Sequence, residues 1–168
     1  MTTEKNPMRK IKIEKVVLSI GGTGDNLEKG AKLLKLITGR APAKMQSHKR
    51  IPAFGVRPKL EVGAMITIRE NMEDVIKRML ATRDNTLKKS QIGENGFSFG
   101  VKEYIEIPGM EYQRDIGIRG LDVTVTFTRA GKRVKLKKIK QGKIPKRNAI
   151  NKEEIIKFME EKFNTNFI

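Results

Sequence analysis

The stretch LDVTVTFTR, residues 121–129, decides the fold class because its side chains alternate strictly between apolar and polar. The apolar set is Leu121, Val123, Val125 and Phe127. The polar set between them is Asp122, Thr124, Thr126 and Thr128. A period of two is typical of a β-strand with one buried and one exposed face. The chain is therefore predicted to contain a sheet whose second face is free.

Other stretches repeat this pattern and are predicted to join the same sheet. Residues 11–20, IKIEKVVLSI, are rich in β-branched side chains, with Val16, Leu18 and Ile20 alternating. Residues 64–70, AMITIRE, point Ala64, Ile66 and Ile68 one way and Met65, Thr67 and Arg69 the other. FSFGVKEYIEI, 97–107, is predicted as a strand with a candidate bend at Gly100, and IGIRG, 116–120, is a candidate short strand.

Segments with helical periodicity lie between these strands. Helices are predicted over 25–38, over 72–83 and at the end of the chain, each with a capping-type pair: Asp25 with Glu28, Asn71 with Asp74, and Asn151 with Glu154. The fold class is α+β: a mostly antiparallel sheet, helices packed on one face and a long projecting basic loop. Residues 1–168 are taken as one domain, with an N-terminal arm (1–10), a projecting loop (43–63), a basic insert (130–150) and a C-terminal helix (151–168).

The predicted projecting loop reads AKMQSHKRIPAFGVRPKLEVG. Pro42, Pro52 and Pro58 exclude a continuous helix, because proline lacks an N–H group and constrains the residue before it. Long loops in compact domains are usually functional or disordered. This loop combines cations with apolar side chains, which suits an anionic partner. Its cations are Lys44, Lys49, Arg50, Arg57 and Lys59.

The charge of the chain is concentrated in two places. The formal net charge is +17, from 36 basic and 19 acidic residues. Residues 29–60 hold nine basic and no acidic residues, and residues 123–152 hold eleven basic and no acidic ones. Such clustering indicates a defined surface for nucleic acid rather than a generally basic protein.

Several other function classes are disfavoured by composition. Because the chain has no cysteine, it has no disulfides or thiolate metal sites. No apolar run approaches about 18 residues, and the start has no signal-peptide core, so a soluble cytoplasmic protein without membrane contact is expected.

Three local features have competing interpretations. GGTGD, 21–25, lacks the third glycine of a dinucleotide loop and favours a flexible strand-to-helix joint, although its small residues could also admit a polyanion. Residues 129–147 could be only a solvated, disordered run. Phe97 and Phe99 are predicted to pack inward rather than to stack on bases. The lone His48 and scattered carboxylates indicate no metal, cofactor or catalytic site.

Five motifs, in order, resemble one family. They are KIEKVVLSIGGTGD (12–25), TGRAP (38–42), SHKRIPAFGVRPKLEVGAMITIRENM (47–72), GVKEYIEIPGM (100–110) and RGLDVTVTFT (119–128). The chain resembles the universal large-subunit ribosomal protein that binds 5S rRNA, the L-five family. It lacks the N-terminal helix of bacterial members and carries a basic insert, GKRVKLKKIKQGKIPKRN, as in the archaeal and eukaryotic branch.

The resemblance implies a structural, ribosome-bound protein and not an enzyme. Its implied partners are 5S rRNA, large-subunit rRNA, P-site tRNA, a small-subunit head protein and other proteins of the central protuberance. The rRNA contacts are predicted at Ser19, Gly21, Gly22, Thr23, Arg40, Thr67, Arg69 and Thr124. The tRNA-facing loop is predicted to use Gln46, Ser47, His48, Lys49, Arg50, Ile51, Pro52, Phe54 and Arg57, with Lys44 on a phosphate. The cations of the basic insert are Lys132, Arg133, Lys135, Lys137, Lys138 and Lys140.

Two rival functions remain open at this stage. A non-specific DNA-compacting protein would bind duplex DNA as well as structured RNA. An RNA-modifying enzyme would need a cofactor pocket or a catalytic constellation, and the sequence contains no recognisable motif for either.

Overall fold

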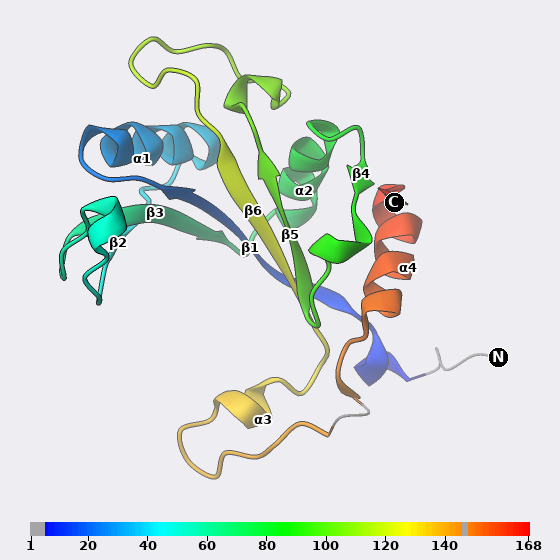
Figure 1. The fold of residues 1–168 in the computed structure, drawn as a ribbon. Helices are drawn as coiled ribbons and strands as arrows, with labels where there is room; N and C mark the ends of the chain where they lie inside the picture. Colours follow the sequence, from blue (N-terminus) through cyan, green and yellow to red (C-terminus); the bar gives the residue numbers. More distant parts are fainter. Residues whose placement is uncertain (1–5, 146–147) are drawn as a thin grey trace.

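The computed structural model describes residues 6–145 and 148–168, and its centre is a five-stranded antiparallel sheet (Figure 1). The strand order is β2-β3-β1-β6-β5. The strands are β1 (Lys12–Gly21), β2 (Ala43–Gln46), β3 (Glu61–Ile68), β5 (Gly96–Val101) and β6 (Leu121–Thr128). A separate parallel pair is formed by β4 (Thr86–Leu87) and β7 (Asn166–Phe167).

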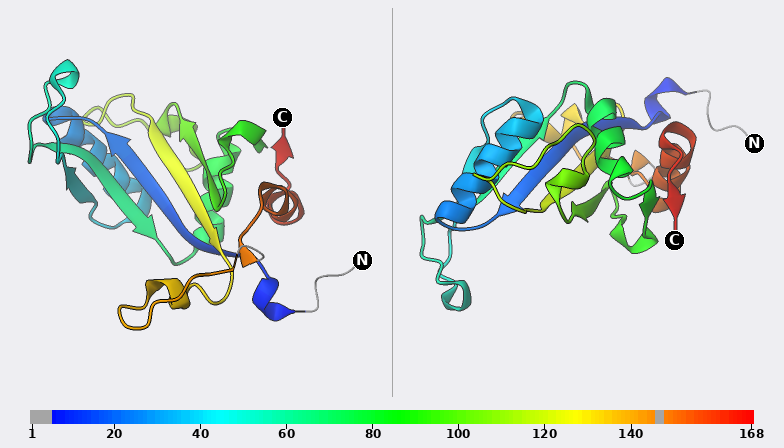
Figure 2. Two further views of the ribbon diagram at one scale, coloured as in Figure 1. Left: turned by 60° about the horizontal axis from the view of Figure 1, so that its bottom comes forward. Right: turned by 90° about the horizontal axis from the view of Figure 1, so that it is seen from above.

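The helices are α1 (Asp25–Thr38), α2 (Met72–Ala81), α3 (Arg133–Leu136) and α4 (Lys152–Phe163). Short 3-10 turns occur at η1 (Pro7–Arg9), η2 (Pro52–Phe54), η3 (Lys89–Gln91) and η4 (Tyr104–Glu106). In the left view of Figure 2, β3 and β1 lie in front of α1, and β6 lies beside β1. The predicted α+β class, with helices on one face, is confirmed.

One face of the sheet carries the core. In β1 the side chains of Val16, Leu18 and Ile20 are buried, as predicted. The predicted apolar sets of β3 and β6 are buried beside them and share one cluster with residues of α1, α2 and α4. Helix α1 approaches β1 closely at Gly30, where an added Cβ would lie 2.9 Å from Cγ2 of Ile20. A side chain at position 30 would therefore push the helix off the sheet.

The helix ends agree with the sequence predictions only in part. In α4 the backbone N–H of Asn151 donates a hydrogen bond to Glu154 (3.0 Å), as the capping pair predicts. For α1 the predicted bounds, 25–38, are confirmed, but the capping pair is wrong, since Gly24 (φ 57°) precedes the helix and Asp25 is already helical. Asn71 before α2 also makes no side-chain cap bond. Its backbone is left-handed (φ 48°), whereas a capping residue usually has an extended backbone.

The 43–63 segment is not a structureless loop, which corrects that prediction. Ala43–Gln46 forms β2, which pairs with β3. The two strands are joined beyond Gln46 by bonds from Ser47 N–H to the Leu60 carbonyl (2.8 Å) and from Lys59 N–H to the Ser47 carbonyl (2.7 Å). Antiparallel pairing satisfies these backbone groups, which a free loop would leave to water. We call residues 47–60 the β2–β3 connection, and both views of Figure 2 show it extending from the body.

Three other boundaries differ from the sequence predictions. Strand β5 ends at Val101 and does not reach 107, because Tyr104 turns into the core and its hydroxyl accepts a bond from Gln113 N–H (2.8 Å). Gly100 does not interrupt β5, since it pairs with Asp122. Residues 116–120 form no strand.

The predicted C-terminal helix does not reach residue 168. Helix α4 ends at Phe163, because Asn164 adopts a left-handed backbone (φ 51°). The chain then forms β7, where the N–H of Asn166 donates to the Asn85 carbonyl (2.8 Å).

Gly96→Ala is expected to lower the free energy of unfolding by about 1–3 kcal/mol. The reason is that a Cβ at position 96 would lie 2.2 Å from the Val125 carbonyl oxygen, so the β5–β6 ladder must shift. Urea unfolding followed by circular dichroism measures the change. The control is Gly21→Ala, where the added Cβ meets nothing within 4 Å. Equal stability of the two variants would contradict the packing described here.

Candidate RNA-binding surface

The second face of the sheet, called here the open face, is formed by residues that alternate with the core set. Strand pairing assigns to it Ala43 and Met45 of β2; Gly63, Met65 and Thr67 of β3; Lys15, Val17, Ser19 and Gly21 of β1; Asp122, Thr124, Thr126 and Thr128 of β6; and Gly96, Ser98 and Gly100 of β5. Most of these side chains are small and polar. A face of this kind is too polar to be a core and is suited to hydrogen bonding.

Three predicted contact residues come together on this face. Val17 lies opposite Thr67 on one side and Thr124 on the other. Ser19 lies in the next row, opposite Met65 and Asp122. Neighbouring strands are about 4.8 Å apart, so Thr67 and Thr124 are separated by roughly 10 Å. Hydroxyl groups on this face can contact one stretch of sugar-phosphate backbone at more than one position.

Glycines flatten one end of the open face. Gly21 lies opposite Gly63 in the ladder, and a Cβ added to Gly21 would meet nothing within 4 Å. Gly22 continues the pairing, since its N–H donates to the Val62 carbonyl (3.1 Å). Thr23 follows and is exposed. The backbone here can be approached closely by a large polyanion.

The N-terminus of α1 contributes less positive potential than the glycine loop alone indicates. Asp25 and Glu28 both lie in its first turn. Their carboxylates offset the partial positive charge of the helix end. Close approach of the backbone, rather than the helix dipole, is therefore what this loop offers.

The two predicted arginines lie in different settings. Arg69 is exposed one residue beyond β3, at the border of the open face. Arg40 instead bonds through Nη2 to Glu70 Oε2 (2.5 Å). Both side chains of this pair are largely exposed, so it contributes only about 0–1 kcal/mol, and a phosphate could replace Glu70.

The β2–β3 connection exposes both cations and apolar side chains. Phe54 is 77% exposed beside the turn at Pro52, and Ile51 is 42% exposed. His48, Lys49, Arg50 and Arg57 are exposed as well, and the structure describes no ion pair for them. Val56 is the exception, because it is buried and bridges to Ile51.

Lys44 serves a different purpose from the predicted phosphate contact. Its ammonium group pairs with Glu28 of α1 and, at 3.3 Å, with Glu61 of β3. The hydrogen bond to Glu28, followed by that to Glu61, raises the pKa of Lys44. The side chain therefore ties the edge strand β2 to α1, and the cations beyond it stay available.

The basic insert is held against the body at its first residues. The ammonium group of Lys132 pairs with Glu14 of β1. The buried guanidinium of Arg129 donates to the Ala149 carbonyl (3.0 Å) and to Glu154 (2.6 Å) of α4. The remaining predicted cations, which are exposed and for which the structure describes no carboxylate partner, are Arg133, Lys135, Lys137, Lys138 and Lys140. The end of the predicted run, residues 146–147, lies outside the described residues.

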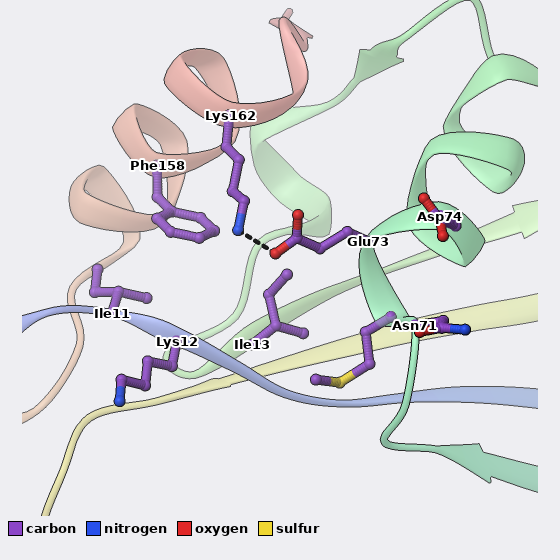
Figure 3. Close-up of a pocket in the computed structure, with 9 residues that line it drawn as sticks. Ile11, Lys12, Ile13, Asn71, Glu73, Asp74, Phe158 and Lys162 are labelled. Atoms are coloured by element: carbon purple, nitrogen blue, oxygen red, sulfur yellow. Dashed lines mark hydrogen bonds and ion pairs between the residues drawn. The ribbon is translucent and has the colours of Figure 1, made fainter.

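A separate cavity of about 510 Å³ lies between β1, α2 and α4 (Figure 3). Across it the ammonium group of Lys162 pairs with Glu73 and lies 5.6 Å from the Phe158 ring centroid. This pairing joins α2 to α4. Within residues 6–145 and 148–168 no cluster of three or more His, Asp or Glu side chains is suited to a metal ion. In the same ranges no helix is long and apolar enough to cross a membrane.

Comparison with known proteins agrees with these features. The family model described as "Ribosomal protein L5" matches residues 6–57, and the companion model for the C-terminus of the same ribosomal family matches residues 61–159. The chain belongs to the ribosomal protein L5 family. This membership makes it a ribosomal protein and removes the RNA-modifying enzyme as an alternative.

Its curated relatives match along nearly their whole length and are named "Large ribosomal subunit protein uL5". The relative from Nanoarchaeum equitans is 41% identical and covers 98% of this chain and 99% of its own. That from Methanococcus maripaludis strain C6 is 40% identical, with 98% and 95% covered. That from Methanobrevibacter smithii is 38% identical, with 97% and 98% covered. All three are archaeal, in line with the predicted branch.

The predicted rRNA contacts omit part of the open face. Lys15 and Ser98 share this face with the predicted residues, as does Thr126 of the predicted polar set, and the alternation of their strands is the signal that could have added them. The inward packing predicted for Phe97 and Phe99 is confirmed, since both are buried with ring centroids 6.0 Å apart. The open face therefore offers hydroxyl groups and backbone rather than stacking aromatics.

The Arg129–Glu154 contact is expected to make stability depend on pH. Burial opposes ionisation of Glu154, but the bonds from Asn151 N–H and Arg129 outweigh it and lower its pKa below 4.5. A carboxyl group whose pKa is lowered by folding stabilises the folded state at pH values above its unfolded-state pKa. This stabilisation is lost as the pH falls through the folded-state pKa. Urea unfolding between pH 7 and pH 3 should therefore show the wild type losing more stability than Glu154→Gln. Glu161→Gln on the same helix is the control, and a parallel loss in all three proteins would refute the account.

Proposed function

We propose that this chain is a structural constituent of the large ribosomal subunit that binds 5S rRNA through the open face. The observation that carries the proposal is the convergence of Ser19, Thr67 and Thr124 from three strands on the face of the sheet opposite the core. Arg69 borders this surface, and the Gly21–Gly63 pair leaves room beside it. Membership in the L5 family supports the same function.

The mechanism is recognition of RNA shape and phosphate. Double-stranded RNA is bound mainly through 2′-hydroxyl and phosphate contacts, which hydroxyl side chains and backbone N–H groups can make. Gly22 and Thr23 would bring the backbone close to the RNA, and Arg40 would exchange Glu70 for a phosphate. If about six phosphates are neutralised, the log of affinity should fall with the log of salt concentration with a slope of about −4 to −5.

The β2–β3 connection is proposed to contact P-site tRNA. The proposed residues lie at the end of β2 and in the connection, and all except the half-buried Ser47 are exposed: Gln46, Ser47, His48, Lys49, Arg50, Ile51, Pro52, Phe54 and Arg57. Lys44 positions this hairpin through Glu28 and is not itself proposed as a contact. Large-subunit rRNA, other central-protuberance proteins and a small-subunit head protein are proposed as further partners of the same domain, residues 1–168.

A non-specific DNA-compacting protein is the alternative. It would bind duplex DNA through the same clustered cations. Competition among 5S rRNA, random RNA and duplex DNA at one salt concentration separates the two functions. Preference for 5S rRNA supports the proposal, and equal binding of all three refutes it.

Thr67→Ala combined with Arg69→Ala is expected to weaken 5S rRNA binding by about 1.5–3 kcal/mol, the value of a hydrogen bond to a charged group. The salt slope should become shallower by about 1, since one phosphate contact is lost. Filter binding over a salt series measures both quantities. Lys77→Ala, which removes one exposed cation from α2, is the control. An unchanged dissociation constant in the double variant would show that 5S rRNA does not bind at this face.

Replacing residues 48–58 by Asn-Gly is expected to spare folding and 5S rRNA binding but to weaken retention of P-site tRNA on ribosomes. The bonds between Ser47 and residues 59–60 would still close the hairpin. Ribosomes reconstituted with this variant are assayed for tRNA dissociation from the P site, with circular dichroism as the folding check. Loss of 5S rRNA binding in a folded variant would show that the connection serves a different partner.

A further inference from the structure

A groove of about 810 Å³ separates the basic insert from the end of the open face. Thr126 and Thr128 of β6 line it, and so does Asn95, which directly precedes β5. Its other wall comes from the insert, including Lys135 and Lys143. The groove is therefore continuous with the surface proposed to bind 5S rRNA, but it lies beyond the residues assigned to that contact.

The groove is shaped by bonds within the protein. The N–H of Gly142 donates to the Val134 carbonyl (3.1 Å), and the side chain of Gln141 donates to the Lys135 carbonyl (2.5 Å). These bonds close the insert into a loop. The Lys132–Glu14 pair then fixes one end of that loop to β1. A pre-formed wall lowers the entropy cost of binding, because this part of the chain is already ordered before the ligand arrives.

The lining combines three kinds of groups. Lys135 and Lys143 are exposed cations for which the structure describes no carboxylate partner. Thr126, Thr128 and Asn95 supply hydroxyl and amide groups. Ile144 and Pro145 add apolar surface. Phosphate, base edge and base face are the three parts of a nucleotide that such groups contact.

We infer that this groove holds an unpaired ribonucleotide of ribosomal RNA, clamped between the basic insert and the open face. The inference rests on the proposed function, because ribosomal RNA bound at the open face would bring a nucleotide to this end of the sheet. The volume is in the range of about 300–1,000 Å³ that is usual for sites of small ligands. A base splayed out of a helix fits a site of this kind, whereas a base paired inside a duplex keeps its edges covered.

The test uses the full chain with a single-stranded hexauridylate as the probe. NMR chemical shifts of backbone amides in the groove are measured during titration. The single strand, and not a short RNA duplex, should change the shifts of Thr126, Thr128, Gln141 and Gly142. Lys135→Ala combined with Lys143→Ala should reduce hexauridylate affinity by roughly tenfold, the equivalent of about 1.4 kcal/mol. The matched control is Lys137→Ala combined with Lys138→Ala, which removes the same charge from the same insert but not from the groove wall.

The inference is overturned by any of three results. The two double variants could lose affinity equally, the duplex could shift the groove amides as much as the single strand, or hexauridylate could shift only residues outside the groove. Separate displacement of labelled hexauridylate by 5S rRNA and by large-subunit rRNA assigns the source of the nucleotide. Displacement by neither refutes a ribosomal ligand.

The two proposals fail separately. If the chain binds 5S rRNA but hexauridylate does not change the chemical shifts of the groove amides, the proposed function stands and the inference about the groove is refuted. A chain that binds hexauridylate in the groove but not 5S rRNA loses the proposed function.

Discussion

The pairing of β1 with β3 on one side and β6 on the other is the constraint on which the structure depends. Because side chains alternate along each strand, this pairing places Val16, Leu18 and Ile20 in the core and Val17 and Ser19 on the opposite face. Helices α1, α2 and α4 contribute to the core on the first face. A shift of one residue in the register would bury the hydroxyl groups and expose the core, so the packing that stabilises the domain also fixes its open face.

Ion pairs divide the cations of this chain into two groups. Lys44, Arg129 and Lys132 are held by carboxylates and tie an edge strand, a helix and the insert to the body. The acidic partners lie in other parts of the sequence, just outside the stretches without acid or far along the chain. Cations for which the structure describes no such partner include those of the β2–β3 connection and the rest of the insert, and others lie on α1 and elsewhere on the surface. The first group shapes the protein, and the second group gives its surface a positive field that can attract RNA.

The surface segments proposed to contact RNA are fixed to the sheet. The open face is flat where glycines meet, polar along β6 and bordered at its two ends by cationic segments. Each segment is joined to the sheet by backbone or side-chain bonds rather than by a free linker. Contacts made by such segments cost less entropy on binding than contacts made by disordered tails.

The strands with clear alternation, the three long helices, the L5 family resemblance and the clustering of charge could all be predicted from the sequence, since these depend on local pattern and composition. Which cations are paired follows from the folded arrangement. It also decided that Ala43–Gln46 forms an edge strand, that β5 stops at Val101 and that β7 pairs with β4. These features depend on partners distant in the sequence, such as Glu14 for Lys132 and Asn85 for Asn166. Local propensity does not predict such partners, because a backbone group or a charge can be paired with any suitable group that lies beside it in the folded chain.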